Sequence, residues 1–140
     1  MPITRETIAL VRESFAAAAQ LPNVGELFYR DLFALEPSLR HLFSADIDAQ
    51  AERLMQMIGL AVGKLDDLDA LVPVLQQLGR RHDGYGVTEL HYIVVGTALM
   101  RTLHDGLGAA FTPAHHQAWA AVYGWMANTM MGAVKRQVAA

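Results

Sequence analysis

Leu78-Gly79-Arg80-Arg81-His82-Asp83-Gly84-Tyr85-Gly86-Val87 is the segment from which the architecture of this chain can be worked out. Upstream of it, Leu71 and Leu75 lead to Leu78 at helical spacing, and His82 continues that apolar stripe one turn further on. The glycines that follow predict that the helix ends there. A histidine in this position is either a hydrogen-bonded core residue or a metal ligand, because a neutral imidazole offers one lone pair.

The composition indicates a single folded domain with an unusually apolar inventory. The chain has 140 residues, and we expect one domain over residues 1–140. Apolar residues make up 53% and charged residues 18%, with a mean hydropathy of +0.21. This chain is therefore more apolar and less charged than an average soluble domain. The surplus predicts a buried apolar cofactor, a subunit interface, or both.

Several classes of protein are disfavoured by what the sequence lacks. No segment approaches the roughly 20 consecutive apolar residues of a membrane span, and the first residues lack the layout of a signal peptide. The absence of cysteine excludes disulfides, thiolate metal sites and cysteine nucleophiles. A net charge of −3 gives no general attraction to nucleic acid. We therefore expect a cytoplasmic protein with no membrane span and no nucleic-acid partner.

Helical periodicity runs through nearly the whole chain, and no segment shows a convincing period-two strand pattern, so the predicted class is all-α. Thr4, Thr88 and Thr112-Pro113 are residues that typically begin helices. A helix is expected to end before Pro37. The acidic cluster Asp66–Asp69 suits the positive end of the next helix.

The other histidines, the methionines and the remaining sequence motifs give no further indication of a functional site. We expect the other histidines at the surface, and these are His41, His91, His104, His115 and His116. The methionines are interpreted as core packing. There is no Gly-rich phosphate loop, no His-Glu-x-x-His, no Gly-x-Ser-x-Gly and no repeated Glu-x-x-His of a di-iron bundle.

Six motifs occur in an order and spacing that resemble the bacterial globins, closest to the globin domain of flavohaemoglobins and their single-domain relatives. They are Leu27-Phe28-Tyr29-Arg30-Asp31-Leu32-Phe33, Pro37 followed by Phe43, Gln50 with Leu54, Arg80-Arg81-His82, Tyr92-x-x-Val95-Gly96 and Trp119-x-x-x-Tyr123-Gly124. The resemblance covers essentially the whole chain. It implies a globin fold, in which helices pack around a pocket for haem b (iron protoporphyrin IX).

The resemblance also implies roles for individual residues. His82 is expected as the proximal iron ligand, with its other ring nitrogen donating to a backbone carbonyl or hydroxyl. Tyr29 and Gln50 are expected on the distal side, where they stabilise the ligand of a pentacoordinate or weakly hexacoordinate iron. Further cofactor contacts are expected from Phe28, Phe43, Leu54, Ile58, Leu78, Arg81, Val87, Tyr92, Val95 and Tyr123. Among them, Phe43 is expected to stack on the haem and Arg81 to pair with its carboxylates.

One departure from the family pattern bears on the chemistry. The family completes a proximal triad of histidine, tyrosine and a late glutamate, and Tyr92 is present here. The glutamate position falls at about Val134, and no Asp or Glu follows Asp105. Peroxidase-like chemistry is therefore disfavoured. The flavin and nicotinamide modules of a flavohaemoglobin are also absent from the printed chain, so electrons are expected from a separate reductase.

The favoured function is reversible binding of dioxygen, for transport or storage, with carbon monoxide and nitric oxide as further ligands. Nitric oxide dioxygenation with a separate reductase is an enzymatic alternative. A haem-based gas sensor and a cofactor-free helical interaction module are two others, and the last fails if the purified protein is red. Both a monomer and a homodimer are compatible with the sequence, since apolar residues on the last two helices suit a dimer.

Overall fold

The computed structural model describes residues 3–43 and 46–139, and these ranges contain helices and turns but no strand. The predicted all-α class is confirmed. The elements in chain order are α1 (Arg5–Ala19), α2 (Val24–Leu35), η1 (Pro37–Leu42), α3 (Ile47–Gly63), α4 (Leu68–Gly84), α5 (Glu89–Leu107), η2 (Gly108–Ala110) and α6 (Pro113–Ala139). Among the described helices, none combines the length and apolar character that crossing a bilayer requires.

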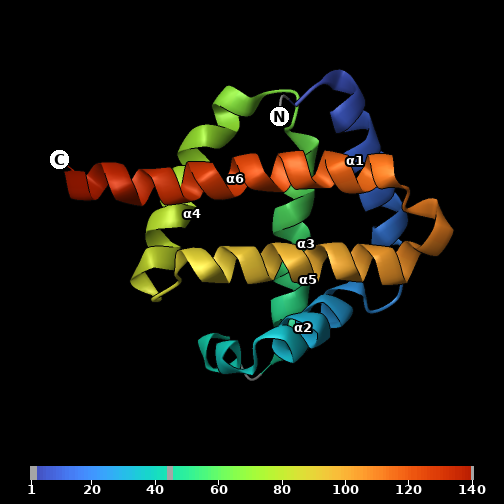
Figure 1. The fold of residues 1–140 in the computed structure, drawn as a ribbon, viewed down its shortest axis with the longest axis horizontal. Helices are drawn as coiled ribbons and strands as arrows, with labels where there is room; N and C mark the ends of the chain where they lie inside the picture. Colours follow the sequence, from blue (N-terminus) through green and yellow to red (C-terminus); the bar gives the residue numbers. More distant parts are fainter. Residues whose placement is uncertain (1–2, 44–45, 140) are drawn as a thin grey trace.

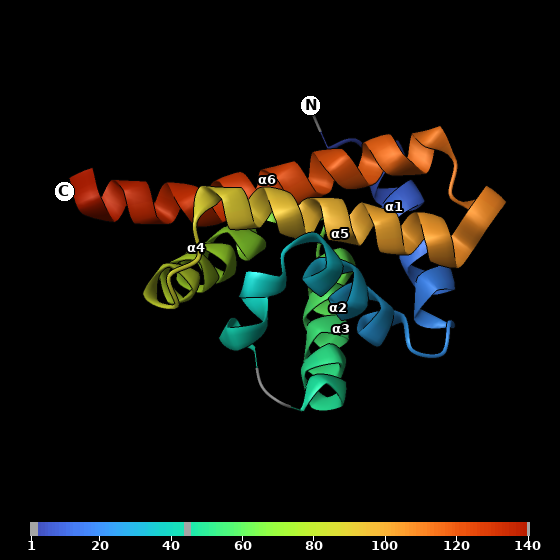
Figure 2. The ribbon, with the colours of Figure 1, turned by 60° about the horizontal axis from the view of Figure 1, so that its bottom comes forward.

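The two longest helices form the platform on which the others pack. Figure 1 shows α5 and α6 side by side, with α3 crossing behind both. The turned view in Figure 2 keeps α5 and α6 adjacent and shows α3 running away from them. α4 packs against α6, whereas α2 packs against both α5 and α3. The helix that carries His82 and the helix that carries Tyr29 are thus held by different partners.

The helix ends lie where the capping residues predict them. The hydroxyls of Thr4 and Thr88 accept hydrogen bonds from backbone N–H groups in the first turns of α1 and α5. The Asp67 carboxylate does the same for α4, and Pro113 begins α6. α2 ends at Leu35, before the proline that begins η1. Local chemistry therefore sets the boundaries of most elements.

The end of α4 is fixed by a Schellman motif. The Val87 N–H donates to the His82 carbonyl at 3.0 Å, and the Gly86 N–H donates to the Asp83 carbonyl at 3.0 Å. Gly86 has φ +81, a left-handed conformation that glycine adopts without a Cβ penalty. The turn therefore stops the helix just beyond His82 and holds its last turn in place.

Two apolar clusters make the core. In the larger one, the buried Trp119 of α6 packs near α1, and its Nε1 donates to the Ser14 hydroxyl at 2.7 Å. The smaller cluster joins α2 to α5 around Phe28, Tyr29 and Ala98. Among the residues that the structure describes, no buried side-chain nitrogen or oxygen atom is without a hydrogen-bond partner. The cluster around Tyr29 belongs to the contact between α2 and α5.

The prediction that His115 lies at the surface is wrong. His115 is 6% exposed, on the first turn of α6. Its Nδ1 accepts a hydrogen bond from the Thr112 N–H at 3.1 Å, and its Nε2 lies 3.3 Å from a carboxylate oxygen of Glu13. His115 therefore caps the start of α6 through Thr112 and links α6 to α1 through Glu13. His41 and His104 are exposed as expected, whereas His91 and His116 are half-buried.

A very close crossing of α4 and α6 gives the first stability prediction. A Cβ added to Gly79 would lie 2.1 Å from the Met130 carbonyl oxygen, a rigid backbone atom. Gly79→Ala is expected to lower the free energy of unfolding by about 1–3 kcal/mol, because the two helices must separate. Denaturant unfolding followed by circular dichroism measures the loss.

Gly124 provides the matched control for this substitution. It lies in the interior of α6, and a Cβ there would meet nothing within 4 Å. Gly124→Ala is expected to leave stability unchanged or raise it by about 0.5–1 kcal/mol, since alanine favours helix. Equal stability losses in the two variants would contradict the packing argument.

Candidate functional site

His82 lies in the last turn of α4, and one of its ring nitrogens makes a hydrogen bond within the helix. Its Nδ1 lies 2.7 Å from the Leu78 carbonyl oxygen. A carbonyl only accepts hydrogen bonds, so Nδ1 carries the proton and donates it. The Nε2 lone pair is therefore left for another partner, and the ring orientation is fixed by the helix itself. The expected carbonyl partner for this histidine is confirmed.

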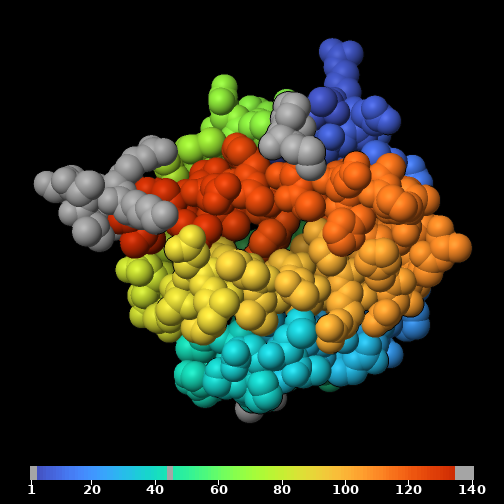
Figure 3. Space-filling view, in the orientation of Figure 1, coloured from blue at the N-terminus to red at the C-terminus, as the bar shows by residue number. Residues whose placement is uncertain are grey.

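Three cavities share Met126 of α6 as a wall residue, and His82 lines two of them. The largest, of about 290 Å³, lies between α3, α4 and α6. A second, of about 160 Å³, has His82, Tyr92 and Tyr123 on its walls, and a third, of about 130 Å³, is bounded by Phe28 and Leu54. They share lining residues, and together their volumes fall within the roughly 300–1,000 Å³ of a cofactor site. The space-filling view also shows the surface hollowed between α5 and α6 (Figure 3).

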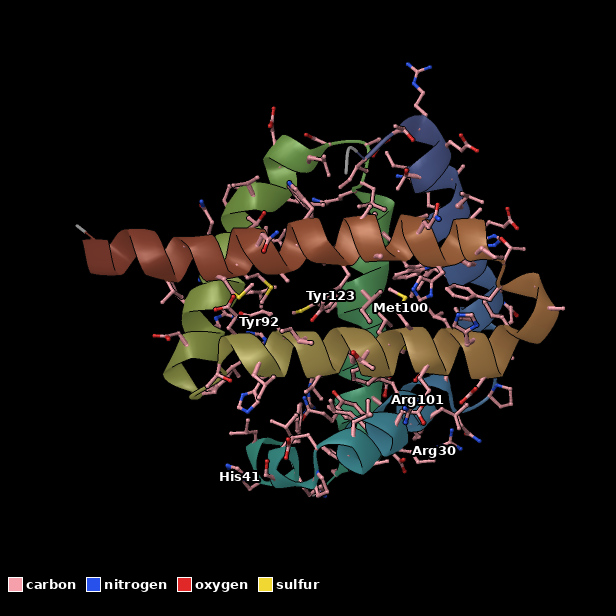
Figure 4. All side chains as sticks on the ribbon, viewed as in Figure 1. Arg30, His41, Tyr92, Met100, Arg101 and Tyr123 are labelled. Atoms are coloured by element: carbon pink, nitrogen blue, oxygen red, sulfur yellow. The ribbon has the colours of Figure 1, made fainter. Side chains whose placement is uncertain are left out.

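Two tyrosines occupy the wall opposite α4. Figure 4 shows Tyr92 and Tyr123 in the region between α5 and α6. The Tyr123 hydroxyl donates to the Tyr92 carbonyl at 2.5 Å, and a Cβ on Gly96 would lie 2.8 Å from the Tyr123 ring. Burial raises the pKa of both hydroxyls, that of Tyr123 far above its ordinary value. Both tyrosines are therefore neutral, and Tyr123 is clamped against α5.

Tyr29 is held in an aromatic cluster on α2. It is 2% exposed, and its ring centroid lies 5.2 Å from those of Phe28 and Phe43 and 5.8 Å from that of Phe33. Burial raises the pKa of its hydroxyl, while a hydrogen bond with the Gln50 side chain and the charge of Arg53 lower it. The phenol is thus neutral, rigid and supplied with a polar partner from α3.

The structure brings most of the predicted cofactor contacts together, but not all. The residues on the walls of the three cavities include Phe28, Leu54, Ile58, Leu78, Arg81, His82, Val87, Tyr92, Val95 and Tyr123. Three predicted residues, Tyr29, Gln50 and Phe43, are not among the residues on those walls. They form a separate cluster, in which Tyr29 contacts Phe28 and Phe43, and Gln50 lies one turn before Leu54 on α3. This cluster is called the distal cluster below.

Met126, Met130 and Lys64 are among the wall residues that the sequence analysis does not assign to the site. Met126 lies on the walls of all three cavities and Met130 on two, although methionines were interpreted as core packing. Met126 follows Tyr123 by three residues on α6, a spacing that places both on one face. Lys64, the residue after α3, borders the 290 Å³ cavity, as Arg81 does. These two exposed cations stand at its rim.

The lining suits a flat apolar cofactor that needs one axial ligand and carries anionic groups. The walls of the 130 Å³ cavity are apolar throughout, and His82 provides a neutral nitrogen with a fixed tautomer. Arg81 and Lys64 provide positive charge at the solvent rim. An iron porphyrin with carboxylate side chains matches this set of donors, walls and charges.

The position that the family pattern gives to glutamate carries no carboxylate in this chain. Val134 occupies that position on α6 and is partly buried. The described partner of His82 Nδ1 is a neutral carbonyl oxygen. The imidazole therefore lacks the anionic partner that increases its electron donation.

Comparison with known proteins gives a consistent family. A sequence model of the globin family, described as Globin, matches residues 26–130. The chain is 32% identical to the flavohemoprotein of Bacillus subtilis (strain 168) over 137 residues, covering 95% of this chain and 34% of that protein. It is 33% identical to the flavohemoprotein of Bordetella parapertussis over 138 residues, covering 93% of this chain and 33% of that protein. The chain thus spans about a third of the length of these relatives.

Solved structures agree on the fold. The bacterial globin of Campylobacter jejuni matches with a TM-score of 0.81, over 98% of this chain and 100% of that chain. Sequence identity in that comparison is 22%, so the likeness bears on the fold alone. The predicted globin architecture is confirmed.

Proposed function

Since this chain belongs to the globin family, whose members hold haem and bind gases, we propose that it binds haem b through His82 and takes up dioxygen reversibly. The observation that carries this proposal is the His82 ring, with Nδ1 bonded to Leu78 and Nε2 left beside the apolar cavities. When bound, the haem supplies a ferrous iron that coordinates diatomic gases. Oxygen transport or storage is the role we favour.

The residues of the chain have distinct tasks in this proposal. His82 holds the cofactor and sets its position relative to α4, because its ring cannot turn without losing the Leu78 bond. Arg81 and Lys64 bind the carboxylates of the cofactor at the rim. Leu54 and Val95 exclude water from the ligand side, which favours reversible binding over oxidation.

The distal cluster supplies hydrogen-bond donors on the side reached from α2 and α3. Tyr29 is the main donor in the proposal, since a neutral phenol on a packed ring loses little rotamer entropy when it donates. Gln50 supports Tyr29 or controls ligand access. The Gln50 side chain is more flexible and is half-buried, so it is more easily displaced.

A visible spectrum tests the proposal directly. The purified protein is expected to be red, and its ferrous form should change spectrum separately with dioxygen and with carbon monoxide, then recover when each gas is removed. A colourless protein that does not take up added haem would refute both the haem proposal and the gas-binding role.

Nitric oxide dioxygenation is the second candidate, favoured by the sequence similarity to two flavohemoproteins. Converting nitric oxide and dioxygen to nitrate consumes one electron per turnover. The residues that match these relatives cover only about a third of each. In this proposal a flavin-dependent reductase supplies that electron.

We expect slow nitric oxide consumption by the 140-residue chain alone. A nitric oxide electrode, with NADH present, should record little beyond a single turnover until a flavin-dependent reductase is added. The absence of an anionic partner for His82 also argues against rapid redox cycling. Sustained NADH-driven consumption without added reductase would contradict this expectation.

A further inference from the structure

Arg53 contacts the distal cluster from the outside. It follows Gln50 by three residues on α3, so the two side chains are neighbours on one face. The Arg53 Nη2 donates to the Gln50 Oε1 at 3.2 Å. Arg53 is exposed whereas Gln50 is half-buried, so the guanidinium holds the outer end of the amide at the solvent boundary.

This contact decides which end of the Gln50 amide faces inward. A glutamine amide has one oxygen, which accepts, and one NH₂ group, which donates. With Oε1 directed at Arg53, the NH₂ group is the end available to Tyr29. The Gln50 side chain is within reach of the Tyr29 hydroxyl, and this contact lowers the pKa of that hydroxyl against the larger, opposite effect of burial.

The direction of that bond has a consequence for Tyr29. If Gln50 donates to the phenol oxygen, the Tyr29 hydroxyl does not spend its own proton on Gln50. If the amide were reversed, its oxygen would accept that proton. Because Tyr29 is 2% exposed and packed between Phe28 and Phe43, its hydroxyl cannot donate its proton to bulk water instead. The amide orientation therefore determines whether the phenol is a free donor.

We propose that Arg53 is a positioning residue, which orients the Gln50 amide so that Tyr29 directs its own proton toward a gas ligand. The proposal rests on the haem-globin function above, and adds a third member to the pair expected from sequence. An exposed ion or hydrogen-bond partner ordinarily contributes little to folding. Here the effect of Arg53 is on amide orientation, so ligand retention responds while stability does not.

The test compares Arg53→Met, which keeps a long apolar side chain, with Arg53→Lys, which keeps the charge. In stopped-flow measurements, Arg53→Met should speed dioxygen dissociation about two- to fivefold, the range of an exposed charged partner. Arg53→Lys should restore most of the wild-type rate. Arg101→Ala, which removes an exposed arginine from α5, is the control and should leave the rate unchanged.

A second readout reports on the electrostatic field rather than on ligand release. The infrared stretching band of carbon monoxide taken up by the ferrous protein shifts to higher frequency when a nearby donor turns away. Arg53→Met should produce that shift and Arg101→Ala should not. In a Gln50→Ala background, Arg53→Met should have no further effect on either readout, because Arg53 acts through Gln50.

The outcomes separate this proposal from the function on which it rests. If the wild-type protein binds neither haem nor gas, the proposed function fails. If it binds both, but Arg53→Met has the wild-type dissociation rate and infrared band, the positioning role alone is refuted. Equal effects of Arg53→Met with and without Gln50 would also refute it, since Arg53 would then act on the ligand directly.

Discussion

Replacing His82 with alanine is expected to remove most of the bound haem, or to leave a haem that exchanges with free imidazole. The ring is held by its Nδ1 bond to the Leu78 carbonyl, and its Nε2 stands beside the cavities between α3, α4 and α6. The side chain is half-buried on the surface of α4, so its loss should not unfold the protein. Haem content by absorbance, before and after gel filtration with and without imidazole, measures the effect.

His41→Ala is the control for this experiment, because His41 is an exposed histidine on η1, away from α4 (Figure 4). That variant should retain wild-type haem content. Circular dichroism should show that His82→Ala keeps its helices. Full haem retention by His82→Ala, with an unchanged ferrous spectrum, would remove this residue from the proximal position.

Tyr29→Phe is expected to speed dioxygen dissociation about ten- to hundredfold, the equivalent of the roughly 1.5–3 kcal/mol of a charge-assisted hydrogen bond. Dioxygen is polarised more strongly than carbon monoxide when a ferrous haem protein takes it up, so carbon monoxide release should change much less. Phenylalanine preserves the ring contacts with Phe28, Phe33 and Phe43. Stopped-flow displacement measures the dissociation rate of each gas. Loss of the hydrogen bond should change mainly the dioxygen rate, whereas a change in packing should affect both rates.

Gln50→Ala is the comparison for Tyr29→Phe, and should accelerate dioxygen release by a smaller factor. The phenol is buried and fixed by neighbouring rings, whereas the amide loses more rotamer freedom when it is held. If Gln50→Ala speeds release tenfold and Tyr29→Phe leaves it unchanged, the roles of the two residues are reversed.

The helices could be predicted from the sequence because capping residues and glycines set helix ends through contacts with their own neighbours in the chain. Thr4, Thr88 and Pro113 begin helices in the structure as their capping chemistry predicts, and Gly86 ends α4 in the left-handed conformation that favours glycine. The stripe that ends at His82 predicts a buried, inward-facing histidine, and in the structure this side chain is half-buried on a cavity wall. The family resemblance supplied the arrangement of the helices, which periodicity alone leaves open.

Features that depend on contacts between helices were harder to predict. The sequence alone predicts His115 at the surface, because its partner Glu13 is 102 positions away along the chain. Arg53 had a signal in its three-residue spacing from Gln50, yet its significance depends on the approach of Tyr29 from α2. Met126 is apolar and gives no chemical sign that distinguishes a cavity wall from a filled core.

The resonance Raman spectrum of the gas-free ferrous protein tests the central claim, that His82 is the axial ligand of a bound haem. An iron–histidine stretching band is expected in the wild-type protein, and it should shift when histidine nitrogens are labelled with ¹⁵N. The band should be absent from His82→Ala and present in His41→Ala. A labelled-histidine band that persists unchanged in His82→Ala would show that another histidine holds the iron, and would contradict the site described above.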